Sequence, residues 1–462
     1  MKVKKIFIFL TLAFLFCASV FAEYNSYGIP DSAEIRKTIQ NSWFSQSLSE
    51  LRTKNSELRK NNLGQTFQIR MEERVDFCVV IVAPESYLNV DLISGSSKET
   101  VKMSVYPEGA PGSFVLFREK SSGKPIKIQW YFNADPDVYL EFYENANKTY
   151  VDMLVCSSYA AKSVPLSVKF SYLFSAGFED ILRLTKMSLP WQKVQVVPGL
   201  YRESLQMIQV IRENLPKIDY AENACYNENG KLYSILTGKK FTLKDENGNE
   251  YFPEENGRLT LSGAGFAKWI IDGLLVSYTG SGSKIEKMLQ PTLEYSSTSK
   301  NGILSQKYNL SFSLDWCRNL AAEALCARTS ANYDFKTGGL DVNKNFFAAE
   351  NDGGQLVNSA GYILNTGYSV KKLKGILYML AVTEPSYFYL AAIKQVSQVK
   401  YDEMVFNNCA VIFPYFDDSG HFDCAVFTMN TEVSLEDFID SNSTSYVHLE
   451  RVKSSNYFAP KQ

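Results

Sequence analysis

Histidine is nearly absent from this chain of 462 residues, which contains only His421 and His448. A Ser-His or Cys-His nucleophilic mechanism must therefore use one of these two imidazoles as its base, unless a lysine or a carboxylate takes that role. The sequence also has no Cys-x-x-Cys pair, so a conventional Cys/His zinc site is not expected. We expect no structural metal and no cofactor.

The chain also lacks an excess of charge of either sign. Its 48 Lys and Arg residues are nearly balanced by 50 Asp and Glu residues, which gives a formal net charge of −2. No strong positive field is present to attract nucleic acid or an anionic membrane. We expect neither as a partner. The P-loop and G-x-S-x-G motifs are absent too.

Long apolar runs occur only at the start of the chain. There, three lysines precede an apolar run from Ile6 to about Phe16, and small residues follow, which is typical of a secretory signal peptide. The run is shorter than the roughly 20 residues that span a bilayer. We expect a signal peptide at 1–22, cleaved near Ala22, and a periplasmic or secreted protein. A lipoprotein acylated at Cys17 is the alternative.

Removal of the signal peptide leaves seven cysteines, and an odd number means that at least one thiol is unpaired. Cys78 and Cys156 lie inside apolar, strand-like runs, where cysteine most often serves as a small buried hydrophobic residue. We therefore expect mostly buried thiols and few disulfides, despite export.

Short apolar and aromatic runs follow one another over residues 66–175, separated by turn signals such as YPEGAPGS and NADPD. This spacing is typical of an all-β sandwich, which serves either as a carbohydrate-binding module or as a structural spacer. A charged, mildly periodic stretch from Ile35 to Lys60 predicts a helix before it. We expect an N-terminal helical segment at 23–65 and a β-sandwich domain at 66–175.

Two prolines, Pro190 and Pro198, break the strand pattern and predict a linker at 176–202. The remainder, 203–462, mixes predicted helices with predicted strands, which is typical of an α+β domain. The clearest helices are 265–276, 316–328 and 369–384, and the clearest strands are 409–416, 421–427 and 446–452. The sequence therefore predicts a multi-domain protein, with an all-β domain before an α+β domain.

Two stretches, SGAGF at Ser262–Phe266 and CAVIFPYFDDSGHFDCAVF at Cys409–Phe427, resemble motifs of the NlpC-type papain-like cysteine peptidases of bacterial cell walls. Those peptidases open their catalytic helix with Asp-Cys-Ser-Gly-Phe and carry the base His at the start of a later strand. The resemblance implies a papain-like scaffold, with His421 as the base and His448 as the third polar residue. It places Gly263 at the nucleophile position, where glycine supplies no thiol.

Simpler interpretations stand beside this one. Gly263 and Gly265 allow close packing at the start of a buried helix. Cys317 is an alternative nucleophile for His421, if a cap at the helix start lowers the pKa of its thiol; otherwise it is a core residue. His421 and His448 are then an exposed turn residue and a cross-strand polar residue.

We expect an exported bacterial envelope protein that binds peptidoglycan or another envelope component without catalysis. The alternatives are a cysteine hydrolase that cleaves peptidoglycan peptides with Cys317 and His421, and a purely structural surface protein. Geometry distinguishes them in part. A catalytic site that has lost its thiol requires the Gly263 Cα to lie about 5 to 8 Å from the His421 ring.

Overall fold

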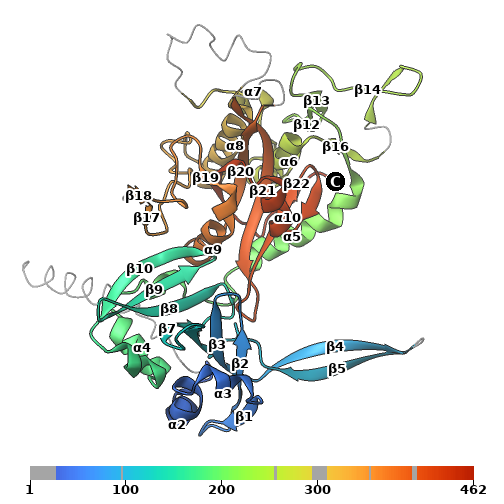
Figure 1. Ribbon diagram of the computed structural model, residues 1–462. Helices are drawn as coiled ribbons and strands as arrows, with labels where there is room; N and C mark the ends of the chain where they lie inside the picture. The colour runs from blue at the N-terminus through green and yellow to red at the C-terminus, as the bar shows by residue number, and fades with distance from the viewer. Residues whose placement is uncertain (1–27, 95–96, 254–256, 294–309, 353–354, 398–402) are drawn as a thin grey trace, which may run out of the picture. The chain divides into compact units, whose positions relative to one another are not determined.

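The computed structural model describes residues 28–462, except 95–96, 254–256, 294–309, 353–354 and 398–402. The predicted signal peptide and Cys17 therefore lie outside the described residues. The chain forms two compact units (Figure 1). The first comprises Met1–Met153 and Ser163–Gln195, and the second comprises Leu154–Lys162 and Val196–Gln462. In the described part of the chain, no helix is both long enough and apolar enough to cross a membrane.

The first unit contains an antiparallel sheet of eight strands in the order β1-β2-β3-β6-β7-β8-β9-β10. The prediction of a sheet-rich N-terminal half is thus confirmed, although all eight strands belong to one continuous sheet. Most connections are tight turns between neighbours in sequence, as the turn signals predict. The strands are β1 (Glu57–Lys60), β2 (Thr66–Glu73), β3 (Phe77–Pro84), β6 (Phe114–Glu119), β7 (Pro125–Tyr131), β8 (Val138–Asn145), β9 (Lys148–Val155) and β10 (Ser158–Leu166).

Short helices pack on one face of this sheet. Phe114 on β6 and Trp130 on β7 are paired across the ladder, so their side chains share a face. The Phe44 ring stacks on Phe114 at 5.6 Å, and the Phe178 ring meets Trp130 at 4.8 Å. These ring contacts join the short helices to one face of the sheet. The layer is formed by α2 (Ala33–Ile39), the π-helical turn η1 (Gln40–Phe44), α3 (Leu48–Arg52), η2 (Phe170–Phe174), α4 (Phe178–Thr185) and η3 (Trp191–Lys193).

The continuous helix predicted from Ile35 to Lys60 is wrong. The first helix ends and a new one begins after Ser47, whose hydroxyl accepts a hydrogen bond from the Glu50 amide while the Glu50 carboxylate accepts one from the Ser47 amide. This capping box restarts the helix. The last four residues, Glu57–Lys60, form β1 because they pair antiparallel with β2. The stretch predicted as a linker, 176–202, includes α4 and η3.

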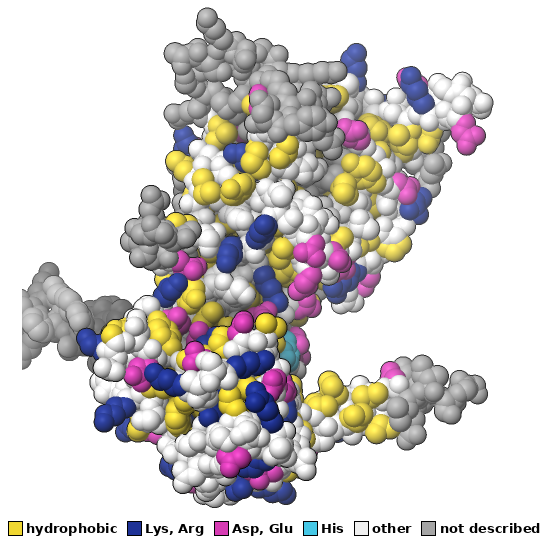
Figure 2. Space-filling model, in the orientation of Figure 1, with side chains coloured by type: hydrophobic (Ala, Val, Ile, Leu, Met, Phe, Trp, Pro, Cys, Tyr) yellow, Lys and Arg dark blue, Asp and Glu magenta, His cyan; other side chains and the backbone are white. Residues whose placement is uncertain are grey.

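A separate two-stranded ribbon, β4 (Ser86–Ser94) and β5 (Ser97–Val105), extends from the sheet of the first unit (Figure 1). Leu88 pairs with Met103 and Val90 with Val101, so these four side chains share one face. Leu88 and Met103 are 56% and 51% exposed, and Figure 2 shows apolar side chains along this ribbon. A two-stranded ribbon buries little apolar surface by itself.

A buried arginine ties the helical layer together. Arg36 on α2 is 1% exposed, and its guanidinium donates hydrogen bonds to the carbonyl oxygens of Leu173, Phe174 and Ala176 at 3.3, 3.0 and 2.7 Å. It also donates to the Ser32 hydroxyl at 2.9 Å. Burial lowers the pKa of Arg36 to about 10. One side chain therefore satisfies the carbonyls at the end of η2, more than 130 residues away in sequence.

The second unit is built on an antiparallel sheet of six strands in the order β19-β24-β20-β21-β22-β23. The predicted strands 409–416, 421–427 and 446–452 correspond to β21, β22 and β24. Successive residues of the central strands are buried, so both faces of these strands are covered. The strands are β19 (Tyr368–Ser369), β20 (Tyr387–Val396), β21 (Met404–Phe416), β22 (Phe422–Thr428), β23 (Thr431–Val433) and β24 (Tyr446–Lys453).

Helices cover both faces of this sheet (Figure 1). On one face, Phe266 of α6 (Gly263–Thr279) meets Phe427 of β22 at 6.2 Å, and α8 (Phe312–Thr329) packs beside α6. On the other, Tyr378 of α9 (Leu373–Thr383) meets Phe416 and Phe422 at 5.0 and 5.5 Å. All three predicted helices are therefore present.

Smaller elements complete the second unit. The parallel pair β11 and β16 leads directly into α6. The bounds of these elements are α5 (Arg202–Asn214), η4 (Leu215–Lys217), β11 (Ile218–Tyr220), β12 (Ala224–Tyr226), β13 (Leu232–Ser234), β14 (Leu243–Lys244), β15 (Glu250–Tyr251), β16 (Leu259–Leu261), α7 (Ile285–Met288), β17 (Glu350–Asp352), β18 (Gln355–Val357), η7 (Val370–Lys372) and α10 (Leu435–Ser441).

Replacing Arg36 with methionine should destabilise the first unit, because methionine keeps the apolar stem but leaves three buried carbonyl oxygens without their donor. We expect the free energy of unfolding of this unit to fall by about 3 kcal/mol or more. Hydrogen exchange of the α2 and η2 amides in the full chain measures this loss. Lys37→Met is the matched control, since Lys37 is the exposed neighbour on the same helix; equal exchange in both variants would refute the role given to Arg36.

Candidate functional site

The segment that resembles the start of a catalytic helix does begin a helix. α6 starts at Gly263, and Ser262 is its N-cap: the Ser262 hydroxyl accepts a hydrogen bond from the Gly265 amide at 3.1 Å and donates one to the Ala224 carbonyl at 3.0 Å. The Ser262 amide donates to the same carbonyl at 2.9 Å. The cap satisfies an amide that the helix itself leaves free, and it fixes the helix start to β12.

The two glycines in the first turn of α6 differ in what surrounds them. A Cβ atom on Gly265 would lie 2.2 Å from the Ala224 carbonyl oxygen, so only glycine fits there. A Cβ on Gly263 would lie 3.7 Å from the Cys409 carbonyl oxygen and 4.0 Å from the Met429 amide nitrogen, which are ordinary contacts. Close packing therefore explains Gly265 but not Gly263, where a side chain has room.

His421 lies far from this helix start. Gly263 is next to Cys409 and Met429, which flank one end of the β21–β22 ladder, whereas His421 lies in the turn at the other end. Six residues separate Ala410 from Phe416 along β21, so the two ends are roughly 20 Å apart at about 3.3 Å per residue. His421 is exposed, and its amide donates to Asp417. The expected approach of His421 to Gly263 is therefore wrong.

Cys317 is a core residue in the second turn of α8. Its side chain is fully buried, and its Sγ lies 3.8 Å from the Sγ of Cys409 on β21. Burial first, and then the neighbouring Cys409 and Glu450, raise the pKa of the Cys317 thiol well above its usual value. A nucleophilic thiol needs the opposite shift. The expected Cys317–His421 pair is not formed, because Cys317 contacts the ladder end opposite to His421.

His448 lies at the centre of a buried polar cluster, which we call the His448 cluster. Neither His448 nor Glu450 has any exposed surface. The His448 Nδ1 atom lies 2.7 Å from the Glu450 Oε1 atom, and its Nε2 atom lies 2.9 Å from the Tyr362 hydroxyl. The two residues are neighbours on one face of β24, as the sequence suggests. The cluster comprises Arg318, Asp341, Tyr362, His448 and Glu450.

A buried ion pair holds the cluster to α8. The Arg318 guanidinium donates to the two carboxylate oxygens of Asp341 at 3.1 and 2.6 Å, in the bidentate geometry that gives the strongest pairs. It also donates to Asn365 Oδ1 at 3.1 Å and to Thr292 Oγ1 at 3.2 Å. The Asp341 carboxylate in turn lies 3.8 Å from His448 Nε2.

Burial shifts the pKa values of His448 and Glu450 in opposite directions. Desolvation, and then the positive charge of Arg318, lower the pKa of His448 to about 3. Desolvation, and then the negative charge of Asp341, raise the pKa of Glu450 well above its usual value. The pair therefore keeps one proton between Glu450 and His448 and carries no net charge, because isolated buried charges are costly.

Asp341, His448 and Glu450 have the residue types of a metal site, and their ligand atoms lie within 4.8 Å of one another. Their present contacts fit a metal poorly. Arg318 occupies both Asp341 oxygens and places a positive charge where a cation would bind, and both His448 nitrogens lie within hydrogen-bond distance of a protein atom. The arrangement favours a structural role for the cluster.

Sequence reasoning identified His448 but missed the rest of the cluster. One signal was present: Leu314, Arg318 and Ala321 share a face of α8, and a charged residue among apolar ones on a helix face suggests a buried pair. Asp341 and Tyr362 lie in loops without regular periodicity, so their positions depend on tertiary packing.

Comparison with known proteins adds one match. A family model described as a domain of unknown function, DUF8515, matches residues 25–193. The match covers the first unit and ends before the candidate site. No curated protein and no solved structure matches the chain.

The two glycines of α6 should respond differently to alanine. Gly265→Ala should reduce the free energy of unfolding by about 2 kcal/mol or more, because the new methyl group overlaps the Ala224 carbonyl. Gly263→Ala should change the free energy of unfolding by less than about 0.5 kcal/mol. Thermal unfolding of the two variants measures the contrast, and equal stability of the pair would contradict the assignment.

The shared proton of the His448 cluster predicts a pH-dependent stability. Above about pH 6.5 the unfolded chain holds neither proton while the folded pair keeps one, so the free energy of unfolding should fall by up to about 1.4 kcal/mol per pH unit. Below about pH 4.5 the unfolded chain binds both protons, so stability should fall again. Glu450→Gln, whose amide still donates to Nδ1, should lose the decline above pH 6.5.

Denaturant titrations between pH 5 and pH 9 measure this dependence. His421→Gln is the control, because His421 is exposed and should leave the profile unchanged. A decline above pH 6.5 that persists undiminished in Glu450→Gln would show that the proton resides elsewhere.

Proposed function

We propose that this protein is an exported bacterial envelope protein whose second unit is a papain-like scaffold that binds a component of the envelope and does no chemistry. The resemblance to NlpC-type peptidases motivates the scaffold. The N-terminal sequence motivates export, and peptidoglycan is the partner that the resemblance suggests.

The observation that carries the non-catalytic role is the glycine at the first position of α6. The helix start is capped and anchored as a catalytic helix requires, and the position of the nucleophile has room for a side chain. Glycine there leaves the amides of the first turn without a thiolate to stabilise. The lack of a thiol there supports a non-catalytic role, but it does not support the loss of a former Gly263–His421 pair, since the two residues lie at opposite ends of the β21–β22 ladder.

The absence of a usable base supports the same conclusion. The chain has two histidines. His448 is sealed in its cluster with both ring nitrogens within hydrogen-bond distance of Glu450 and Tyr362, and His421 is in an exposed turn at the far end of β22. His421 is out of reach of Gly263 and Cys317, and both ring nitrogens of His448 are engaged, so an acyl transfer through a cysteine has no free imidazole as its base.

Incubation of the mature chain, starting at Glu23, with purified cell-wall sacculi tests the proposal. We expect the protein to co-sediment with the sacculi and to release no peptide above the level of a buffer control. Peptide release that disappears in Cys317→Ser would establish the rival hydrolase. Failure to sediment would favour a purely structural role and would refute wall binding.

A further inference from the structure

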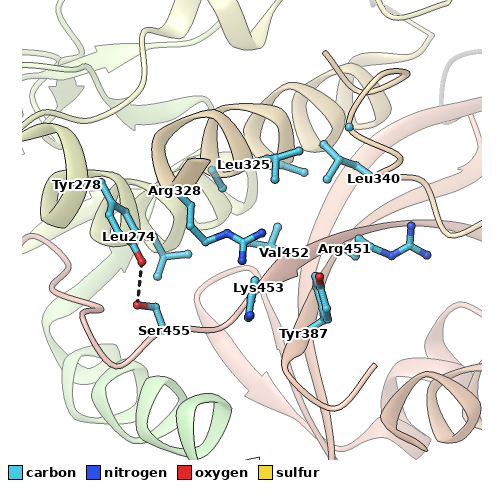
Figure 3. A pocket seen from close by; sticks show the side chains of 13 residues that line it. Leu274, Tyr278, Leu325, Arg328, Leu340, Tyr387, Arg451, Val452, Lys453 and Ser455 are labelled. Atoms are coloured by element: carbon cyan, nitrogen blue, oxygen red, sulfur yellow. Dashed lines mark hydrogen bonds between the residues drawn. The ribbon is translucent and has the colours of Figure 1, made fainter. Parts of the chain in front are cut away.

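A shallow hollow on the second unit combines an apolar floor with cationic edges (Figure 3). It lies among the C-terminal halves of α6 and α8, the loop at Gly338–Leu340 and the end of β24. It is separate from the His448 cluster and from the start of α6. Apolar side chains form the floor: Leu274, Ala321, Ala324, Leu325, Leu340 and Val452.

The charged side chains that line the hollow are all positive. Three of its lining residues are cationic, Arg328, Arg451 and Lys453, and none carries a carboxylate. This bias is local, because the whole chain has a formal net charge of −2. An excess of positive charge around a partly apolar surface attracts organic anions.

The three cations differ in what they bind. Arg451 already has an ion-pair partner, because its guanidinium donates to both carboxylate oxygens of Glu384 at 3.0 and 3.2 Å. Its side chain points away from the hollow in Figure 3. Arg328 reaches from α8 across the hollow toward β24. Among the described residues, no carboxylate forms an ion pair with Arg328 or Lys453. Both are exposed, so their charges are available to a ligand.

Hydroxyl groups line the remaining edge. The Tyr278 hydroxyl and the Ser455 hydroxyl lie 3.4 Å apart and face the hollow from α6 and from the segment after β24 (Figure 3). Such a long contact is weak, so either group can turn to donate to an anion. The hollow thus presents two free cations and two hydroxyls above an apolar floor.

We propose that this hollow binds a small organic carboxylate that carries an apolar group. The carboxylate lies between Arg328 and Lys453, and the apolar group covers Leu325, Leu340 and Val452. Arginine recognises a carboxylate through paired N–H groups, and the floor excludes a hydrophilic anion such as phosphate from full contact. This site is independent of the proposed wall binding.

Isothermal titration of the full mature chain with octanoate and with N-acetylleucine tests the site. The two probes distinguish a fatty acid from the C-terminus of a peptide as the source of the carboxylate. We expect at least one to bind, and octanol, acetate and inorganic phosphate to bind at least about tenfold more weakly, because each lacks either the carboxylate or the apolar group.

The variant Arg328→Gln/Lys453→Gln should weaken binding of the preferred probe by about tenfold or more, while Lys371→Gln, an exposed cation on η7, should leave it unchanged. Circular dichroism verifies that the variants are folded. No binding of either probe at millimolar concentration, equal binding of octanol, or undiminished binding by the double variant would overturn the proposal.

Discussion

The buried guanidinium of Arg318 is the constraint on which the second unit depends. A charge with 2% of its side chain exposed must be compensated inside the protein, because an unpaired buried charge costs several kcal/mol. Asp341 supplies the counter-charge, and Asn365 and Thr292 accept the remaining hydrogen bonds. These partners come from three loops. The Arg318 side chain therefore ties the segments of Thr292 and Asn365 to α8, and its pair with Asp341 adds to the backbone hydrogen bonds that join residues 340–342 to β24.

The same constraint removes the chemistry that the sequence seems to offer. Burial, and then the negative charge of Asp341, raises the pKa of Glu450 and keeps it protonated. Burial, and then the positive charge of Arg318, lowers the pKa of His448 and keeps it neutral, so this imidazole serves the cluster. Arg36 has a similar role in the first unit, where it satisfies three carbonyl oxygens and pairs with the Asp31 carboxylate at 3.5 Å. In both units these buried polar groups serve architecture.

Periodicity predicted most of the framework. The strands at 409–416 and 446–452 and the helices around 265–276 and 316–328 follow from alternation and from 3.6-residue spacing. The predictions that failed concerned contacts between residues far apart in the sequence. The sequence correctly predicted that His421 lies in a turn. The pairing of β21 with β22 places this turn at the end of the ladder opposite to the start of α6. Gly263 and Gly265 look alike in sequence, and only the position of the Ala224 carbonyl distinguishes them.

The most direct test of the central claim, that Cys317 is a core residue and not a catalytic nucleophile, is time-resolved alkylation of the native protein with iodoacetamide at neutral pH, mapped by mass spectrometry. Burial predicts that Cys317 and Cys409 stay unmodified until the chain unfolds, and the raised pKa of Cys317 adds to its protection. A thiol introduced by Gly263→Cys, at a helix N-terminus, should react fast and serves as the positive control. Rapid modification of Cys317 in the native chain, faster than that of a free thiol, would contradict the account.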